Sequence, residues 1–316
     1  MNVLPTEKQI TIVAALTEGC SIRAIERLTE VHRDTIMSLG VRVGQGCARL
    51  HDRLFRELPT QLLQLDEIWS FIGAKQAHRK PGHPGYFGDC YTWTALDAVH
   101  KAIVSYHVGT RSWDDCRAFI WDLRERLTQQ VQITSDGYAP YAPTIRAAFG
   151  WNVDYAQLQK VYEEDLEGER RDAAHRYSPG RVVRVEKEIV FGAPEEAQIS
   201  TSFVERSNLT IRMQQRRWTR LTNAFSRKPE NHRAAMSLFV AWYNLCRVHE
   251  TLRCTPAMSL GVTNHIWTIG ELIDAALSEP KPAPTMPVPP APVRPAPRGF
   301  QLRVIPGGKL SSRTAR

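Results

Sequence analysis

The amino-acid sequence predicts an α/β protein in which a sheet with helices packed on it follows a small all-α domain. From residue 6 to about residue 44, apolar side chains recur at the spacing of short helices. Beyond Pro59 the pattern changes to short runs rich in Val, Ile, Thr, Trp and Tyr, which indicate strands. With 316 residues and 42% hydrophobic content, the chain is long and apolar enough to bury a sizeable core.

The first 45 residues are expected to form a helix-turn-helix domain, with 46–60 as a linker. Ser21 is a plausible N-cap for the middle helix, and the segment from Ser21 to Gly40 has the pattern of helix, turn and helix. In that motif the second helix enters the major groove of DNA, and its N-terminal residues meet the base edges. These residues would be His32, Arg33, Asp34 and Thr35. The alternative is a plain helical bundle used for dimerisation.

Residues 61–267 are expected to form the second domain, with a charged insertion at about 157–201. Its first elements follow the order strand, strand, strand, helix, strand, helix, strand, which is typical of a sheet with helices on it. They are expected at 62–72, 90–99, 101–109, 112–129 with Ser112 as N-cap, 131–136, 142–149 and 153–156. A short helix at 268–279 and a proline-rich basic arm at 280–316 would complete the chain.

A strongly basic stretch follows a single carboxylate, Glu205. Between residues 206 and 233 there are eight Lys or Arg residues and one acid, so this segment carries a net charge of +7. Helical spacing would place Glu205, Arg212 and Arg216 on one face. Such a surface suits a phosphate backbone, and its candidate DNA-binding residues are Arg206, Arg212, Arg216, Arg217 and Arg220. The alternative is a solvated basic helix beside an acidic neighbour.

Two further acids lie in strands. Asp66 interrupts an apolar run, and Asp136 ends the strand beginning at Val131, just before a glycine. A carboxylate in such a position is costly unless something pairs with it, and a divalent cation is a usual partner. Asp66, Asp136 and Glu205 could thus hold two Mg²⁺ ions, or Mn²⁺ in their place, to act on a phosphate. Alternatively, Asp66 caps a neighbouring element and Asp136 bonds its own turn.

The overall charge and the cysteines narrow the class of protein. A net charge of +8 and a pI near 9.3 favour a polyanionic partner. The six cysteines are scattered without a C-x-x-C pair, which argues against a zinc ribbon and a disulfide framework. No apolar run reaches the roughly 20 residues that span a bilayer, so no membrane is expected as partner. A cytoplasmic protein is expected.

In the settings LDEIW, TSDGY and FVERSN, the three acids resemble the acidic triad of DDE transposases of bacterial insertion sequences. The resemblance extends through RMQQRRWTRLTNAFS and WYNLCRVHETLRCTPA and covers residues 6–267. It implies a ribonuclease H-like mixed sheet flanked by helices, with Asp66, Asp136 and Glu205 as catalytic metal ligands. It also implies that the N-terminal domain recognises the ends of a mobile element.

The function implied by this resemblance is metal-dependent cleavage at the element ends, followed by strand transfer of the 3′-hydroxyls into target DNA. The expected partners are double-stranded DNA, as element end and as target, and further copies of the chain on that DNA. The expected location is the bacterial cytoplasm, at the nucleoid. Two alternatives stay open: a transposase-derived DNA-binding regulator without catalysis, and an integrase-like nuclease without strand transfer.

Overall fold

The computed structural model describes residues 4–162 and 182–280. Met1–Glu279 form one compact unit. The proline-rich arm from 281 onward and residues 163–181 of the expected insertion lie outside the described residues. The helices and strands are α1 (Thr6–Thr17), α2 (Ile22–Thr29), α3 (Arg33–Leu54), β1 (Leu62–Ile72), η1 (Gln76–His78), β2 (Gly88–Asp97), β3 (Ile103–Gly109), α4 (Trp113–Glu125), β4 (Val131–Ser135), α5 (Tyr141–Phe149), β5 (Val153–Tyr162), β6 (Val182–Phe191), η2 (Glu196–Gln198), α7 (Ser202–Gln214), η3 (Arg216–Trp218), α8 (Pro229–Leu245), α9 (Pro256–Ser259) and α10 (Ile269–Ser278).

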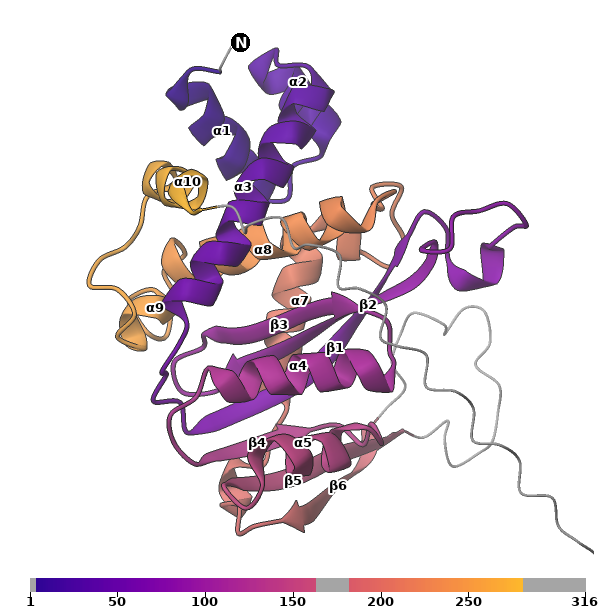
Figure 1. Ribbon diagram of the computed structural model, residues 1–316, viewed down its shortest axis with the longest axis vertical. Helices are drawn as coiled ribbons and strands as arrows, with labels where there is room; N and C mark the ends of the chain where they lie inside the picture. Colours follow the sequence, from indigo (N-terminus) through magenta and orange to yellow (C-terminus); the bar gives the residue numbers. More distant parts are fainter. Residues whose placement is uncertain (1–3, 163–181, 281–316) are drawn as a thin grey trace, which may run out of the picture. The chain divides into compact units, whose positions relative to one another are not determined.

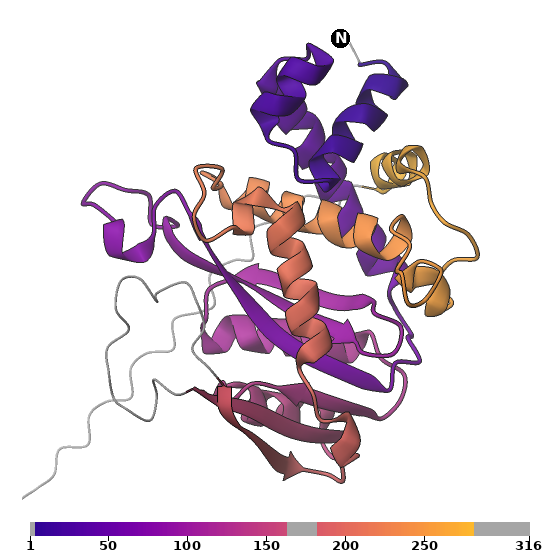
Figure 2. The ribbon, with the colours of Figure 1, turned by 180° about the vertical axis from the view of Figure 1, so that it is seen from behind.

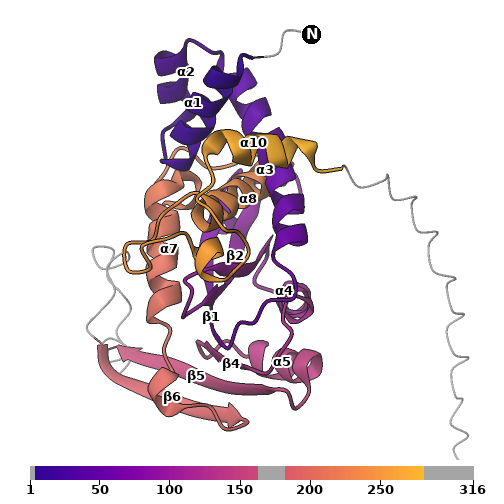
Figure 3. The same cartoon turned by 90° about the vertical axis from the view of Figure 1, so that its left-hand side faces the viewer.

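A six-stranded mixed sheet in the order β3-β2-β1-β4-β5-β6 is the centre of the fold. β1 pairs antiparallel with β2 and β2 with β3, whereas β4 runs parallel to both β1 and β5. Figures 1 and 2 show α4 and α5 on one face of the sheet and α7 on the other. Figure 3 shows the same layers from the side. This arrangement confirms the predicted mixed sheet flanked by helices and preceded by helices.

The expected elements form largely where local chemistry favours them. The Ser21 hydroxyl accepts a hydrogen bond from the Ala24 N–H at 3.1 Å, so it caps α2 as predicted. Ser112 caps α4 through the Asp115 N–H at 3.2 Å. Within the expected charged insertion, Val182–Phe191 forms β6 at the edge of the sheet, paired antiparallel with β5. None of the described helices is long and apolar enough to cross a membrane.

The expected linker at 46–60 is helical over its first half, because α3 continues to Leu54. Gly44 and Gly46 resemble helix breakers in the sequence, but each lies where another helix approaches closely. An added Cβ at Gly44 would lie 2.1 Å from the Ala234 carbonyl oxygen in α8, and one at Gly46 would lie 2.0 Å from that of Ala276 in α10. Close packing therefore outweighs the low helix propensity of glycine, about 1 kcal/mol per residue.

Replacing Gly44 with Ala is expected to lower the free energy of unfolding by about 2 kcal/mol, because backbone atoms of α8 must move to make room. For a protein of this size the melting temperature should fall by about 3 °C. Gly40→Ala on the same helix is the matched control, since a Cβ there meets only the end of the Leu16 side chain at 3.1 Å. Equal melting temperatures for the two variants, measured by calorimetry, would contradict the close approach of α3 and α8.

Candidate active site

Asp66 lies in the middle of β1 and faces α7. Its Oδ2 accepts a hydrogen bond from the Asn208 side-chain amide at 2.7 Å, and its Oδ1 accepts one from the Glu67 N–H at 2.8 Å. The Asn208 carbonyl oxygen in turn accepts from the Thr94 hydroxyl of β2 at 3.3 Å. The carboxylate is thus oriented by the strand that carries it and by a side chain in the middle of α7, so Asp66 does not cap this helix as the alternative interpretation proposed.

Asp136 follows the last residue of β4 and lies at the carboxyl end of that strand. Its Oδ1 accepts a hydrogen bond from the Tyr138 N–H at 3.0 Å, so it stabilises its own turn, as the alternative interpretation proposed. Its Oδ2 lies 3.5 Å from Nη2 of Arg111, whose guanidinium stacks on the Tyr138 ring at 4.3 Å. The hydrogen bond within the turn uses Oδ1 of Asp136, whereas Oδ2 faces the guanidinium of Arg111.

Glu205 lies in the first turn of α7. The N-terminus of this helix is held by hydrogen bonds to a side chain of β1. The side-chain oxygen of Gln64, two residues before Asp66 on the same face of β1, accepts hydrogen bonds from the N–H groups of Phe203 and Val204 at 2.9 and 3.0 Å. These bonds satisfy two amides at the helix N-terminus, which otherwise lack intrahelical partners. Gln64 and Asp66 together fix the helix end that carries Glu205.

The Glu205 carboxylate has two local partners. Its Oε1 accepts a hydrogen bond from the Thr201 hydroxyl at 2.7 Å, and both of its oxygens lie 2.5 Å from Nζ of Lys160 in β5. The side chains of Glu205 and Lys160 are 42% and 30% exposed, so the ion pair lies at the border of solvent. Sequence reasoning missed Lys160, because it lies in a part of the chain that showed no clear pattern.

One pocket of about 310 Å³ brings the three predicted acids together. Asp66, Asp136 and Glu205 all line it, although they come from the middle of one strand, the end of another and a helix. The extension of β5 beyond the last residue pair with β4, Gln157 with Ser135, supplies a further wall through Leu158, Gln159, Lys160 and Tyr162. The pocket is partly open, and polar and apolar surface contribute about equally to its lining.

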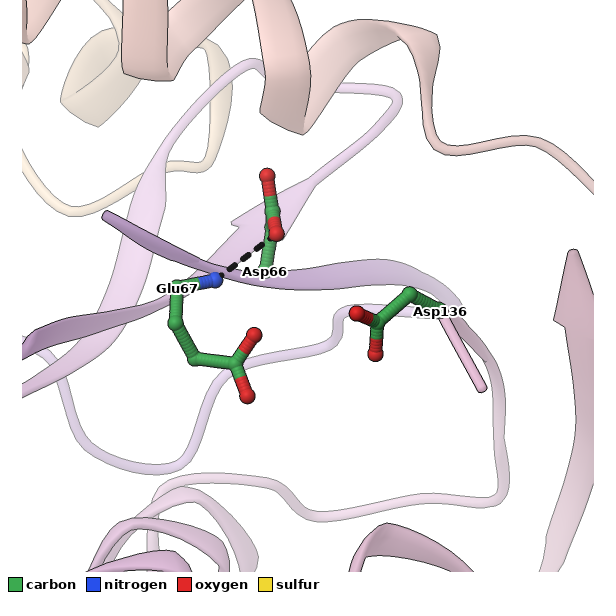
Figure 4. Close-up of side chains that lie close together, drawn as sticks. All are labelled: Asp66, Glu67 and Asp136. Atoms are coloured by element: carbon green, nitrogen blue, oxygen red, sulfur yellow. Dashed lines mark hydrogen bonds between the residues drawn. The ribbon is translucent and has the colours of Figure 1, made fainter. Parts of the chain in front are cut away.

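A fourth acid, Glu67, lies beneath this group on the other face of β1. Figure 4 shows Asp66 and Glu67 on opposite sides of the strand, with the Asp136 carboxylate beside both. The three residues offer carboxylate oxygens that all lie within 4.8 Å of one another. The Glu67 side chain is only 3% exposed, and its Oε1 has no hydrogen-bond partner among the described residues, with Nε of Arg111 3.7 Å away.

Sequence reasoning also missed Glu67, although a signal for it was present. Two adjacent acids in a strand must point to opposite faces. In a central strand that is covered on both faces, both acids therefore become buried. The second acid of LDEIW could have been included on this ground.

Burial and mutual repulsion raise the pKa values of the two β1 acids. Loss of hydration raises the pKa of Asp66 to about 6, and the nearby Asp136 and Glu205 add to the shift. Burial raises the pKa of Glu67 to about 8, with Asp136 again adding to it, while Arg111 acts in the opposite direction. Both shifts favour the protonated, uncharged forms of these two acids in the metal-free site.

The donor set fits a hard divalent cation. All candidate ligands are carboxylate oxygens, which Mg²⁺, Mn²⁺ and Ca²⁺ prefer. Asp66 and Asp136 offer their oxygens close together, and a buried Glu67 oxygen that has no hydrogen-bond partner among the described residues lies beside them. Glu205 lines the same pocket. The group whose ligand atoms are closely spaced consists of Asp66, Glu67 and Asp136 and does not include Glu205.

The basic residues after Glu205 do not share the single helical face that was predicted for them. α7 ends at Gln214, because Gln215 adopts an extended conformation with φ −121° and ψ 95°. Arg216 therefore lies in η3, where its Nε donates to the Gly19 carbonyl at 3.0 Å. Arg217 is half-buried and donates to the Ser226 hydroxyl at 2.8 Å, so part of its hydrogen-bonding capacity is used within the protein.

Arg212 retains the position expected of a phosphate-binding side chain. It is half-buried on α7, and its Nε has no hydrogen-bond partner among the described residues. Burial lowers the pKa of its guanidinium and the adjacent Arg220 lowers it further, whereas Asp66 acts in the opposite direction. Two neighbouring cations beside an acidic pocket indicate that an anion could lie between them. Arg206 and Arg220 are exposed.

The residues expected to read DNA bases lie at the start of α3. His32, Arg33 and Thr35 are all exposed. The His32 ring caps the helix through the Asp34 N–H at 3.3 Å, and the Arg33 N–H donates to the Glu26 side chain at 3.1 Å. The Arg33 and Thr35 side chains stay on the surface, as the predicted role requires.

Among known proteins, this chain aligns with solved transposase structures at low sequence identity. No protein-family model and no curated protein sequence matches this chain. A solved piggyBac transposase synaptic complex with hairpin DNA aligns over 87% of this chain and 72% of its own, with 11% identity and a TM-score of 0.37. A Mos1 transposase paired-end complex with the left transposon end aligns over 48% and 60%, with 15% identity and a TM-score of 0.20. Likenesses at this level carry no argument about function, so any functional inference rests on the pocket.

Proposed function

We propose that this chain is a DNA transposase that cuts phosphodiester bonds at the ends of a mobile element and joins the exposed 3′-hydroxyls to target DNA. The observation that supports it is the pocket in which Asp66, Asp136 and Glu205 meet. These acids lie 70 and 69 residues apart along the chain, so only the fold brings their side chains to one place. A charged, open pocket of this composition suits a phosphodiester more than a small apolar ligand.

In the proposed reaction Asp66, Asp136 and Glu205 hold two Mg²⁺ ions. The bound ions supply positive charge and Lewis acidity at the scissile phosphate. The protein supplies geometry: Asn208 holds the Asp66 carboxylate by a 2.7 Å hydrogen bond, and Gln64 fixes the helix end that carries Glu205. Such orientation favours in-line attack, first by water and later by a 3′-hydroxyl.

The proposed DNA contacts fall into two groups. Arg206, Arg212 and Arg220 would hold the sugar-phosphate backbone beside the pocket, where guanidinium groups bind phosphate oxygens in pairs. Arg33 and Thr35 at the start of α3 would read base edges at the element end. Pairing of two element ends would require more than one copy of the chain, so we propose a homo-oligomer on DNA.

A strand-transfer assay on duplexes that the protein itself selects tests this proposal. Duplexes selected from a random pool by binding to the protein are labelled and incubated with the full chain, Mg²⁺ and a supercoiled plasmid. Labelled duplex joined to plasmid is the expected product, and the same mixture with a chelator is the control. Nicked duplex without joining would indicate a nuclease, and binding without either product would indicate a regulator.

A further inference from the structure

Among the described residues that line the pocket, Lys160 is the one with a positive charge, opposite to the charge of the predicted metal ligands. It lies where β5 runs past the end of β4, and its Nζ is 2.5 Å from both Glu205 oxygens. Its side chain is 30% exposed and that of Glu205 is 42% exposed. Ion pairs with this degree of exposure are weak, because water screens both charges.

A weak ion pair can be exchanged for a stronger partner. A divalent cation offers twice the charge of an ammonium group to the same carboxylate. When it takes the Glu205 oxygens, the Lys160 ammonium loses its partner while it remains at the rim of the pocket. The other two acids that line the pocket, Asp66 and Asp136, would then be engaged by metal as well. The ammonium would need an anion, and the phosphate groups of bound DNA would lie beside it.

We propose that Lys160 is a DNA-phosphate-binding residue that Glu205 masks until metal binds. This inference rests on the proposed function and adds to it an order of events: the metal-free protein keeps Lys160 paired, and metal releases it for the substrate. Metal and DNA would then strengthen each other's binding through this residue, and such a coupling acts equally in both directions.

Binding of a short duplex of arbitrary sequence, measured with and without Ca²⁺, tests the inference in the full-length chain. Ca²⁺ binds carboxylates and avoids cleavage during the measurement. In wild type, Ca²⁺ should tighten DNA binding relative to chelator. Lys160→Met should weaken binding about tenfold or more in Ca²⁺, as expected for loss of a charge-assisted hydrogen bond, and leave binding in chelator unchanged. Lys160→Arg should retain most of the Ca²⁺ effect.

Metal binding without DNA gives an independent readout. Titration of Mn²⁺ followed by electron paramagnetic resonance should show tighter binding by Lys160→Met, by up to about fivefold, because a competitor for Glu205 is gone. The matched control is Lys187→Met on β6, whose Nζ donates to the Glu196 carbonyl at 2.9 Å, away from the pocket acids. It should change neither measurement.

The possible results distinguish a failure of the role proposed for Lys160 from a failure of the proposed function. Equal weakening of DNA binding by Lys160→Met in Ca²⁺ and in chelator, or no weakening in Ca²⁺, would overturn the role of Lys160 while the proposed function stands. An absence of any Ca²⁺ effect on DNA binding by wild type would overturn this inference, whereas the proposed function fails only if the strand-transfer assay gives no product that depends on Mg²⁺. A lower melting temperature of Lys160→Met with unchanged DNA binding would assign Lys160 a purely structural role.

Discussion

Replacing Glu205 with Gln is expected to abolish DNA cleavage, by about 10³-fold or more, while DNA binding stays close to that of wild type. Gln keeps the shape of the side chain and an oxygen that can accept from the Thr201 hydroxyl, but it removes the negative charge that a divalent cation requires. The lost ion pair with Lys160 is exposed, so its loss should cost at most about 1 kcal/mol of stability. Gel-shift and cleavage assays on selected duplexes measure the two effects separately.

Two control variants make this prediction specific. Glu188→Gln removes the same charge from the exposed strand β6 and should cleave like wild type. Arg33→Ala should show the opposite pattern to Glu205→Gln, with weaker binding to selected duplexes and a catalytic site that remains intact. If Glu205→Gln lost DNA binding together with thermal stability, Glu205 would serve the structure of α7 and the proposed catalytic role would be withdrawn.

The sequence predicted those parts of the fold in which a short pattern determines the structure. β1 occupies residues 62–72 as expected, because an apolar run of this length with β-branched and aromatic residues suits a central strand. The acids were proposed on two grounds: Asp66 and Asp136 because a carboxylate in or at the end of a strand is costly without a partner, and Glu205 because it precedes a strongly basic stretch. Ser21 and Ser112 were recognised as N-caps because capping depends on local sequence.

Other features depend on contacts between distant segments and could not be predicted. The continuation of α3 through Gly44 and Gly46 depends on the positions of α8 and α10, about 200 residues later in the chain. The end of α7 at Gln214 coincides with hydrogen bonds from Gln215 and Arg216 to backbone carbonyls of residues 16 and 19, which helical periodicity does not show. Lys160 reaches Glu205 only because β5 extends beyond β4.

The acids of the site could be proposed from the sequence, but the cations that pair with them could not. Arg111 lies between Glu67 and Asp136, and Lys160 faces Glu205, so two cations partly neutralise the metal-free pocket. No spacing in the sequence indicates these pairs. They explain how a protein can keep several carboxylates in one place before metal arrives, and why some repulsion remains as raised pKa values at Asp66 and Glu67.

The raised pKa values of Asp66 and Glu67, caused mainly by burial, should make the contribution of these acids to the stability of the metal-free protein fall as the pH rises. The folded-state pKa values of Asp66 and Glu67, about 6 and about 8, exceed their ordinary values of 3.8 and 4.5. Between about pH 4 and pH 8 these two acids bind more protons in the folded state than in the unfolded state, so their contribution to stability falls with increasing pH in this window. Burial lowers the pKa values of His51 and His232 to about 3, so these histidines act in the opposite direction below about pH 6.5, and the contribution of the acids is measured by comparing variants with wild type in the presence of a chelator.

Replacing Glu67 with Gln should remove much of this pH dependence and stabilise the metal-free protein at pH 8 by about 2 kcal/mol, less than the full pKa shift would give because Arg111 loses a partner. At pH 5, where Glu67 is already protonated, the variant and wild type should melt at similar temperatures. Glu188→Gln, the same change on an exposed strand, should leave the pH profile unaltered. Destabilisation of Glu67→Gln at pH 8 would instead show that the ion pair with Arg111 outweighs the cost of burying the Glu67 charge.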